Sequence, residues 1–383
     1  MKNLMWIFLT AALGIIIGCN QSTNKQNNTS KMAKDNVHLT LVAENSKFVW
    51  NGAVISPKGR LFASMPCWLG PTPGVVEVME DGSFKPYPGG EWNQWDRNKD
   101  PLKSFVDVNS IFIDSNNHMW VNDAAAPDFG KAIEGAIKVI EIDLNTDKVV
   151  RTIVFDPEIV GSNTRLAHIR IYKDYGILAE SKSGSFIIIN LKDNSYRRIL
   201  TGNKEFMLCQ PGEVPVIEGR RMRHNDGRDM YIHNDLLEFR DDPDTLYFMT
   251  LFGSKLFKIN ANDLVNPNLS EAEILNKMEI AYDFKGYWVA GMCRDKEGNL
   301  YLTDAENNGT RKLDTKGNLS TLVTNKEIIW PIAPSIDENG TLYFPASQLN
   351  RFPLLNGGIN TVSKPWKMFK INTNLQKCIN LPE

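Results

Sequence analysis

The chain repeats one pattern of two β-hairpins six times, and this repeat constrains the fold more than any other feature. In each copy an apolar segment leads into a polar turn of Asp, Asn, Gly or Pro type, and a strand with alternating apolar residues follows, as in a hairpin. The first hairpins begin at Ile55, Phe112, Arg170, Glu238, Cys293 and Ser335. The second hairpins begin at Gly74, Gly135, Gly184, Ser254, Gly309 and Lys367.

This repeat predicts an all-β fold, a six-bladed β-propeller in a single domain. One four-stranded antiparallel unit cannot bury both of its faces alone, but it can do so when it packs radially against its neighbours. A pair of β-sandwiches would also give many short strands, and the six in-phase copies favour the propeller. We expect a strand near Leu39–Ala43 to complete the last blade, built from Lys367–Ile379, so that no edge is left free.

The first nineteen residues predict a lipoprotein signal peptide. Lys2 precedes an apolar stretch from Leu4 to Ile17, and Gly18 and Cys19 end it in the manner of a bacterial lipobox. A plain signal peptide with a chance cysteine is the alternative. Residues 20–36 are polar and free of aromatic residues, which predicts a flexible tether. The propeller is therefore predicted over residues 37–383.

Lipidation of Cys19 would anchor the protein to the bacterial cell envelope. We expect the outer membrane and its periplasmic face, because no acidic run follows the cysteine. Contact with the membrane is expected through the lipid only. Changing Cys19 to Ala should then release the protein from the membrane fraction of cells, and unchanged partitioning would contradict the lipoprotein hypothesis.

Composition and short motifs exclude several classes of function. The 383 residues carry a net charge of -2, and no basic run is longer than GRRMR at Gly219–Arg223, so we expect no nucleic-acid partner. The chain has no Gly-x-Ser-x-Gly elbow, His-Glu-x-x-His motif, phosphate loop or dinucleotide fingerprint. Any catalysis would therefore rest on residues scattered over several blades of what we expect to be a monomer.

The cysteines beyond the signal peptide do not form a metal or redox motif. They are widely and irregularly spaced, without a Cys-x-x-Cys pair. Export permits a disulfide, but the sequence does not choose among the possible pairings. We expect mostly buried thiols at Cys67, Cys209, Cys293 and Cys378.

The residues just before each first hairpin are expected at one mouth of the central channel, where a ligand site would form. These approaches contain His168, His233, Asn109, Asn234, Asp235 and Trp330, and the ends of the hairpins add Asp123 and Glu306. We predict catalytic roles for the two histidines, Asp235 and Glu306, and ligand binding for the others. Carboxylates in such a place can bind Ca²⁺ or another divalent cation, or act as general bases.

His233 and Asp235 form the most specific part of this prediction. They are two residues apart on an extended segment, so their side chains are expected on one face. A carboxylate beside the imidazole would favour the charged imidazolium, which can donate a proton or bind an anionic or carbonyl group. The alternative is that His233 only forms a hydrogen bond to the next blade.

Several segments resemble the major royal jelly protein and Yellow family. They include FKPYPGGEWNQW at Phe84–Trp95, the strand pair at Lys138–Phe155 and the closing segment Ile329–Phe352, and the resemblance covers roughly residues 45–372. It implies a six-bladed propeller. Some Yellow proteins convert dopachrome, and other members of the family bind small aromatic or amine ligands without evident catalysis. From the closing segment we add Gln348 to the predicted ligand-binding residues.

The chain departs from more distant gluconolactonase-type propellers, which use a divalent metal. Ala290-Gly291 stands where those proteins have Asp-Gly, and Leu236 follows Asp235 in place of glycine. The family's Trp-Pro-Asp is Trp330-Pro331-Ile332 here. Two hypotheses stay open: a propeller that binds a small aromatic or cyclic molecule, and an isomerase or lactonase-like hydrolase acting on a small cyclic compound.

Overall fold

Six four-stranded antiparallel sheets make up the fold in the computed structural model, which describes residues 38–240, 242–286 and 288–373. The signal peptide with Cys19, the tether and Cys378 lie outside these ranges, so the predictions about them stay predictions. Within the described residues no helix is long and apolar enough to span a membrane.

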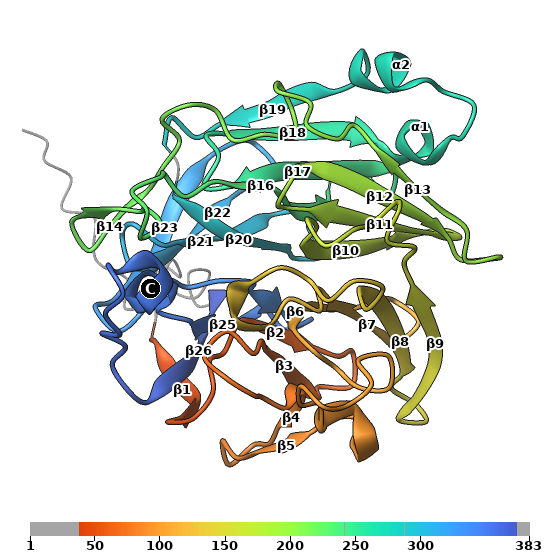
Figure 1. Ribbon diagram of the computed structural model, residues 1–383. Helices are drawn as coiled ribbons and strands as arrows, with labels where there is room; N and C mark the ends of the chain where they lie inside the picture. The colour runs from red at the N-terminus through yellow and green to blue at the C-terminus, as the bar shows by residue number, and fades with distance from the viewer. Residues whose placement is uncertain (1–37, 241, 287, 374–383) are drawn as a thin grey trace, which may run out of the picture. The chain divides into compact units, whose positions relative to one another are not determined.

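Each sheet is one blade and, in five of the six, its strands follow chain order (Figure 1). The first blade contains β2 (Gly52–Ile55), β3 (Leu61–Met65), β4 (Gly74–Val78) and β5 (Phe84–Pro86), and the second β6 (Val108–Ile113), β7 (His118–Asp123), β8 (Lys138–Asp143) and β9 (Lys148–Val154). The third contains β10 (Leu166–Tyr172), β11 (Tyr175–Glu180), β12 (Ser185–Asn190) and β13 (Tyr196–Ile199).

The remaining blades follow the same order until the last. The fourth contains β16 (Ile232–Phe239), β17 (Thr245–Leu251), β18 (Lys255–Asn260) and β19 (Glu279–Asp283), with the short helices α1 (Ala261–Val265) and α2 (Glu271–Leu275) between its last two strands. The fifth contains β20 (Val289–Arg294), β21 (Leu300–Asp304), β22 (Gly309–Leu313) and β23 (Leu319–Thr324). The sixth contains β24 (Ser335–Ile336), β25 (Thr341–Ala346), β26 (Trp366–Asn372) and β1 (Thr40–Asn45).

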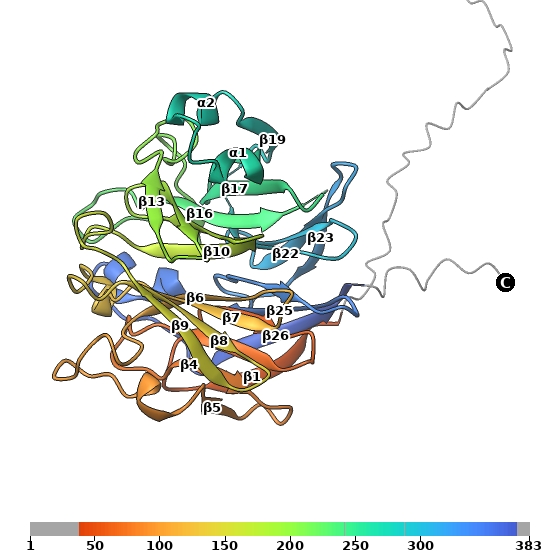
Figure 2. The same cartoon turned by 90° about the vertical axis from the view of Figure 1, so that its right-hand side faces the viewer.

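The N-terminal strand closes the circle. β1 pairs antiparallel with β26, and Thr40 lies opposite Lys370. Figure 1 shows the orange β1 beside the blue β26, and Figure 2 shows the same pair from the side. The first strand of each blade contacts the first strands of both neighbouring blades. The predicted six-bladed propeller and its closure by a strand near Leu39–Ala43 are confirmed, and the pair of sandwiches is excluded.

The apolar core lies between adjacent blades, as the alternating strands require. Phe186 of the third blade packs edge to face on Phe248 of the fourth, with ring centroids 5.2 Å apart. Between the first and second blades, Phe62 and Met119 share another buried cluster. Each sheet thus buries its two faces against its two neighbours.

The turn of the repeated hairpin has a local cause that can be followed at Asp295. Its carboxylate accepts hydrogen bonds from the amides of Glu297 and Asn299, as Asp commonly does in such turns. Gly298 follows with φ of 83°, a left-handed conformation that glycine adopts without steric cost. The acidic residue and the glycine of the repeat therefore define the turn.

Three cysteines lie within the described residues, and they are free thiols. Cys67 and Cys293 are buried, and Cys209 is partly buried. Burial raises the pKa of Cys209 to about 12, so the thiol stays protonated at neutral pH. The prediction of mostly buried thiols is confirmed for these three.

Candidate functional site

The central channel holds two cavities, one at each end of the first strands. The upper cavity, about 380 Å³, lies where the strands begin, and its polar lining includes Asn51, Asn109, Arg165, His168 and Asp235. The lower cavity, about 620 Å³, lies where the strands end. His168 lines both cavities and stands between them. The predicted site corresponds to the upper cavity.

Aromatic and aliphatic side chains form most of the wall of the upper cavity. Trp68 and Phe129 lie in contact with ring centroids 4.5 Å apart, and both line the cavity. Tyr231, Leu251 and Ile332 add to this wall. An apolar wall of this kind accommodates the body of a small organic molecule.

Two long segments are joined beside this cavity. One is the insertion between β13 and β16, which carries the short hairpin of β14 (Val216–Ile217) and β15 (Arg220–Arg221). The other follows β25. Glu218 and Arg351 form an ion pair at 2.5 Å between Oε1 and Nη2, and the Arg220 guanidinium donates to the carbonyl of Asn350 at 2.9 Å. Both segments supply cavity-lining residues, including His224 and Leu349.

The polar end of the upper cavity is formed by Arg165. The Arg165 guanidinium lies 4.7 Å from the ring centroid of Phe129, and its Nη1 is 3.2 Å from Oδ2 of Asp107. The side chain is 13% exposed. Within the described part of the chain this is the guanidinium's one hydrogen bond, so the other N–H groups of its fork are available to a ligand.

Asp107 supports this arginine from a fully buried position. Burial raises the pKa of Asp107 to about 6, and the charge of Arg165 opposes this rise. The backbone amide of Cys67 also donates to Oδ1 of Asp107 at 3.2 Å.

Lys182 is a second cation near the rim of the cavity. Its pKa is lowered mainly by burial, and the positive charge of Arg165 lowers it further. The two cations Arg165 and Lys182 therefore lie close enough to influence one another.

His168 and Asp235 are the predicted residues that the fold brings together. Nδ1 of His168 lies 3.0 Å from the backbone carbonyl oxygen of Asp235 and 3.3 Å from its Oδ1. Both oxygens only accept, so Nδ1 carries the proton and Nε2 of the neutral ring is an acceptor. The pair can therefore present a proton acceptor held in a fixed orientation.

The expected pairing of His233 with Asp235 is wrong. β16 has register irregularities between Ile232 and Asn234 and again between Asn234 and Leu236, so side chains two residues apart do not share a face. Nδ1 of His233 accepts a hydrogen bond from the amide of Cys209. Burial lowers the pKa of His233, which opposes the charged form that was expected.

Asp123 is a structural residue, which corrects the expectation that it binds a ligand. The amides of Val106, Asp107 and Ala125 donate to its carboxylate. Lys138 Nζ lies 2.6 Å from its Oδ2, and both side chains are 0% exposed. The hydrogen bonds from the protein therefore occupy this carboxylate.

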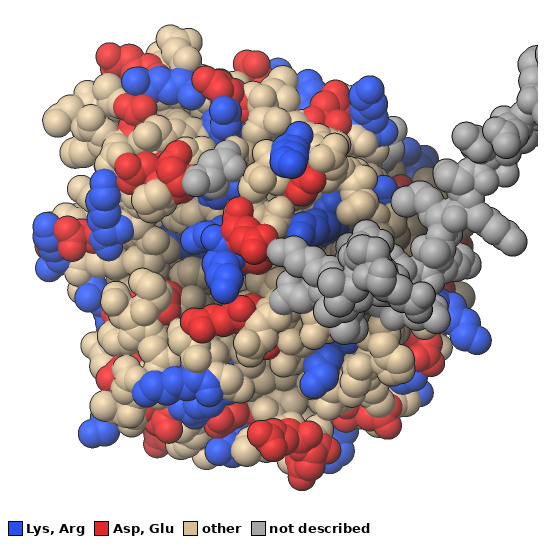
Figure 3. Space-filling view, turned by 180° about the vertical axis from the view of Figure 1, so that it is seen from behind, with Lys and Arg blue, Asp and Glu red and all other residues tan. Residues whose placement is uncertain are grey.

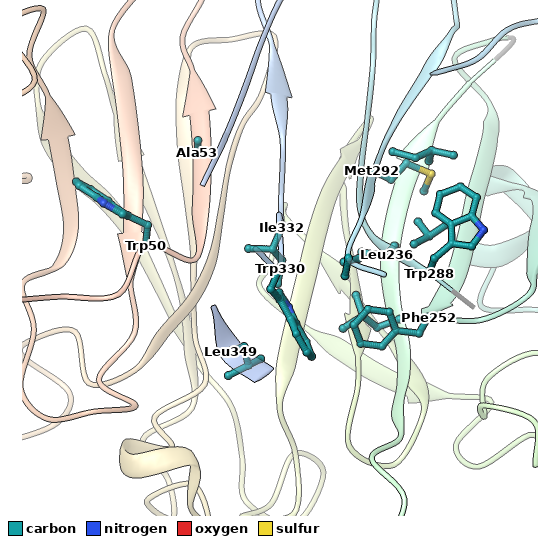
Figure 4. Packing of buried hydrophobic residues seen from close by; sticks show 14 of the residues in the cluster. Trp50, Ala53, Leu236, Phe252, Trp288, Met292, Trp330, Ile332 and Leu349 are labelled. Atoms are coloured by element: carbon teal, nitrogen blue, oxygen red, sulfur yellow. The ribbon is translucent and has the colours of Figure 1, made fainter. Parts of the chain in front are cut away.

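Four other predicted residues also make contacts within the protein. Trp330 is fully buried against Phe252, with ring centroids 5.1 Å apart (Figure 4). Asn234 is fully buried and donates to the carbonyl of Ser185 in the neighbouring blade. Glu306 accepts from the amide of Val216, and Gln348 exchanges hydrogen bonds with Ser363. None of the four is among the described residues that line the upper cavity.

Asn109 lines the upper cavity, as predicted from its position. Its Nδ2 donates to the carbonyl of Leu166 in the next blade, and Nδ2 of Asn51 donates to the carbonyl of Asn109 in the same way.

Three residues of the upper cavity were not predicted from the sequence: Asn51, Arg165 and Lys182. Arg165 stands in the same approach as His168, so a search of the approaches for cations would have found it.

The upper cavity does not fit the divalent cation that gluconolactonase-type relatives would imply. Among the described residues, no group of three or more His, Cys, Asp or Glu side chains is placed to hold a metal ion. Asp235 is the single carboxylate among the described lining residues, and it faces His168. Ala290, which stands where those relatives have Asp, offers no side-chain oxygen. Neither these residues nor the comparisons below establish a cofactor.

Comparisons with known proteins agree with this fold. The chain is similar to a luciferin-regenerating enzyme (11% identity, 88% of this chain and 95% of that chain, TM-score 0.53). It is also similar to the calcium-binding protein regucalcin from Agrobacterium tumefaciens (11% identity, 86% and 93%, TM-score 0.50) and to a streptogramin B lyase (12% identity, 88% and 97%, TM-score 0.50). At these identities the likeness shows the propeller fold alone.

The family is shown by sequence. Among curated proteins no match was found. The family model described as major royal jelly protein matches residues 106–377, which is more than half of the chain. This match spans the strands β6 to β26 and includes His168, Asp235 and Arg165. The chain therefore belongs to the major royal jelly protein family.

Proposed function

We propose that this propeller binds a small molecule with an apolar, aromatic or cyclic body and an anionic group in the upper cavity. The observation that carries the proposal is Arg165 at the end of an apolar wall, with most of its donors unused. A guanidinium of this kind binds a carboxylate through two parallel hydrogen bonds. The Trp68–Phe129 wall would receive the ring of the same molecule.

Arg165 is prepared for this role before a ligand arrives. Its stacking on Phe129 and its contact with Asp107 restrict the side chain, so little conformational freedom is lost on binding. The cavity volume of about 380 Å³ is within the usual range for a small-molecule site. We further propose that the protein acts in the cell envelope, anchored through Cys19, where such a molecule would be met outside the cytoplasm.

Surface charge is also compatible with a small ligand. On the face drawn in Figure 3, basic and acidic side chains are intermixed, and no broad field of one sign covers it. The net charge of -2 agrees with this pattern. A protein that tracks a nucleic-acid backbone has a positive groove or face instead.

A second candidate function is catalysis in the same cavity, and the His168–Asp235 pair favours it. Nε2 of His168 would remove a proton from a carbon next to the carbonyl group of a bound acid, and the imidazolium would return it at another position. That sequence describes an isomerase, and the Asp235 oxygens would stabilise the intermediate imidazolium. A metal-dependent lactonase is less well supported, because the carboxylate ligands are lacking.

The binding proposal predicts a specific loss in the Arg165→Met variant. We expect its affinity for indole-3-acetate to fall about 10- to 100-fold, since a hydrogen bond to a charged group contributes about 1.5–3 kcal/mol. The measurement is calorimetric titration, well below the unfolding midpoint. Combining Arg165→Met with Asp107→Asn gives a second variant that leaves no orphaned carboxylate, and it should show the same loss.

Arg228 provides the matched control, because it lines the same cavity but is highly exposed and paired with Asp226. Arg228→Met should change the affinity less than threefold. Equal losses of affinity in the Arg165 and Arg228 variants would overturn the proposal.

The affinity of the parent protein should also rise as the pH falls through about 6, because protonated Asp107 no longer neutralises Arg165. This rise should be absent in Asp107→Asn.

The catalytic candidate predicts proton exchange that depends on His168. Wild-type protein should accelerate deuterium exchange at C3 of phenylpyruvate, an aromatic acid with a labile C–H, as followed by NMR. The His168→Asn variant should lose about 100-fold or more of that acceleration, while its affinity for indole-3-acetate stays within threefold. Identical exchange rates for the two proteins would exclude His168 as the base.

A further inference from the structure

We infer that the lower cavity is a second binding site, for a small multivalent oxyanion. This site goes beyond the proposed function, because the two cavities share only His168 and Ala333 among their described lining residues. The lower cavity, about 620 Å³, is lined by the first strands of all six blades. Its charged lining residues are Arg170, Lys173, Arg294, Lys296, Asp114, Glu238 and Asp295.

Two of its three carboxylates are engaged by their own hairpin turns. Asp114 accepts from the amides of Asn116 and His118, and its second oxygen accepts from the indole N–H of Trp120. Asp295 is engaged in the same way, and its second oxygen accepts from Asn299 Nδ2 and the hydroxyl of Tyr301. These carboxylates define turns and have little capacity left for a ligand.

Glu238 is the third carboxylate, and it lies between two arginines. Arg170 Nη2 is 2.9 Å from Oε2 of Glu238, and both side chains are about nine-tenths buried. The guanidinium of Arg170 also lies 4.6 Å from the ring centroid of Phe112. Burial, the ion pair with Glu238 and the contact with the Phe112 ring hold Arg170 in one position in the wall of the cavity.

Arg294 has unused hydrogen-bonding capacity among the described residues. Its Nε is 3.8 Å from Oε1 of Glu238, which is too long for a hydrogen bond, and its side chain is 42% exposed. Lys296, two residues further on, lines the same cavity. Lys173 is already engaged by Asp244 and Asn262. The guanidinium fork of Arg294 therefore meets the ligand.

The balance of these charges sets the valence of the ligand. The described lining has four cations and three carboxylates, a formal net charge of +1, and Arg294 and Lys296 are the cations left to meet a ligand. A monoanion can engage one of these two cations, whereas a dianion or trianion presents an ionised oxygen to each and displaces Glu238 from its 3.8 Å contact with Arg294. Phosphate and polycarboxylate groups both have this chemistry.

The test is calorimetric titration of the full chain with inorganic phosphate and with citrate, at constant ionic strength set by sodium chloride. Wild-type protein should bind at least one of them at one site per chain, and the tighter of the two identifies a phosphate or a carboxylate ligand. Arg294→Met should weaken that binding tenfold or more. Because Arg294 is exposed, this variant should keep the parent unfolding midpoint.

Matched variants separate the lower site from a general effect of charge. Lys58 is an exposed cation in the corresponding turn of the first blade, and it does not line the cavity. Lys58→Met and Arg165→Met should both leave phosphate and citrate binding unchanged, and Glu238→Gln should tighten it by removing the repelling charge. Absence of binding by both anions, or equal weakening by Arg294→Met and Lys58→Met, would overturn the inference.

Discussion

A chain that ends at Lys364, before β26, is expected to lose the stable propeller altogether. β26 is hydrogen-bonded to β25 on one side and to β1 on the other. Trp366, Met368, Phe369 and Ile371 of this strand are almost completely buried. Burying four such side chains is worth about 6–12 kcal/mol, which is comparable to the whole stability of a typical domain.

Circular dichroism and calorimetry provide the measurement. The shortened chain should show no cooperative unfolding transition, because β1 then has no partner strand and the circle stays open. The full-length Trp366→Ala variant is the matched control: it should lose about 3–5 kcal/mol but still unfold in one step. Cooperative unfolding of the shortened chain at the parent midpoint would contradict closure by this strand.

A single substitution at Asp123 is also expected to have a large effect. Asp123→Ala leaves the Lys138 ammonium buried without its carboxylate, and breaking a buried pair from one side typically costs about 3–5 kcal/mol. Asp123→Asn combined with Lys138→Met should recover part of this loss, because no charge is then left unpaired. Chemical denaturation of the parent and of these two variants measures the differences.

A surface pair gives the control for Asp123. Lys192 and Asp174 lie 2.7 Å apart, but their side chains are 71% and 54% exposed, so Asp174→Ala should cost less than about 1 kcal/mol. At a temperature where Asp123→Ala is folded, its affinity for indole-3-acetate should equal that of the parent. Unchanged stability with lost affinity would restore the ligand-binding role first predicted for this residue.

The architecture could be predicted because it depends on a repeated local signal. Several hairpin turns are specified by an acidic residue and a glycine, as at Asp295 and Gly298, and six in-phase copies leave few ways to bury the strands. The closing pair of β1 and β26 followed from the same reasoning, since an open circle would expose two edges.

The site was predictable only in part, for physical reasons. Asn109, His168 and Asp235 come just before first hairpins in the sequence, and all three line the upper cavity. Alternation failed at His233, because the irregularities of β16 leave no trace in the sequence. The Glu218–Arg351 pair joins residues far apart in the chain, and no local pattern predicts such a contact.

The central claim is that the upper cavity recognises an anionic group beside an apolar body. It is tested most directly by titrating the wild-type protein with pairs of compounds that share one ring, such as indole-3-acetate and tryptamine. The acid of each pair should bind at least tenfold more tightly than the amine, and the difference should vanish in Arg165→Met. Tighter binding of the amines, or no binding of either member of any pair, would contradict the claim.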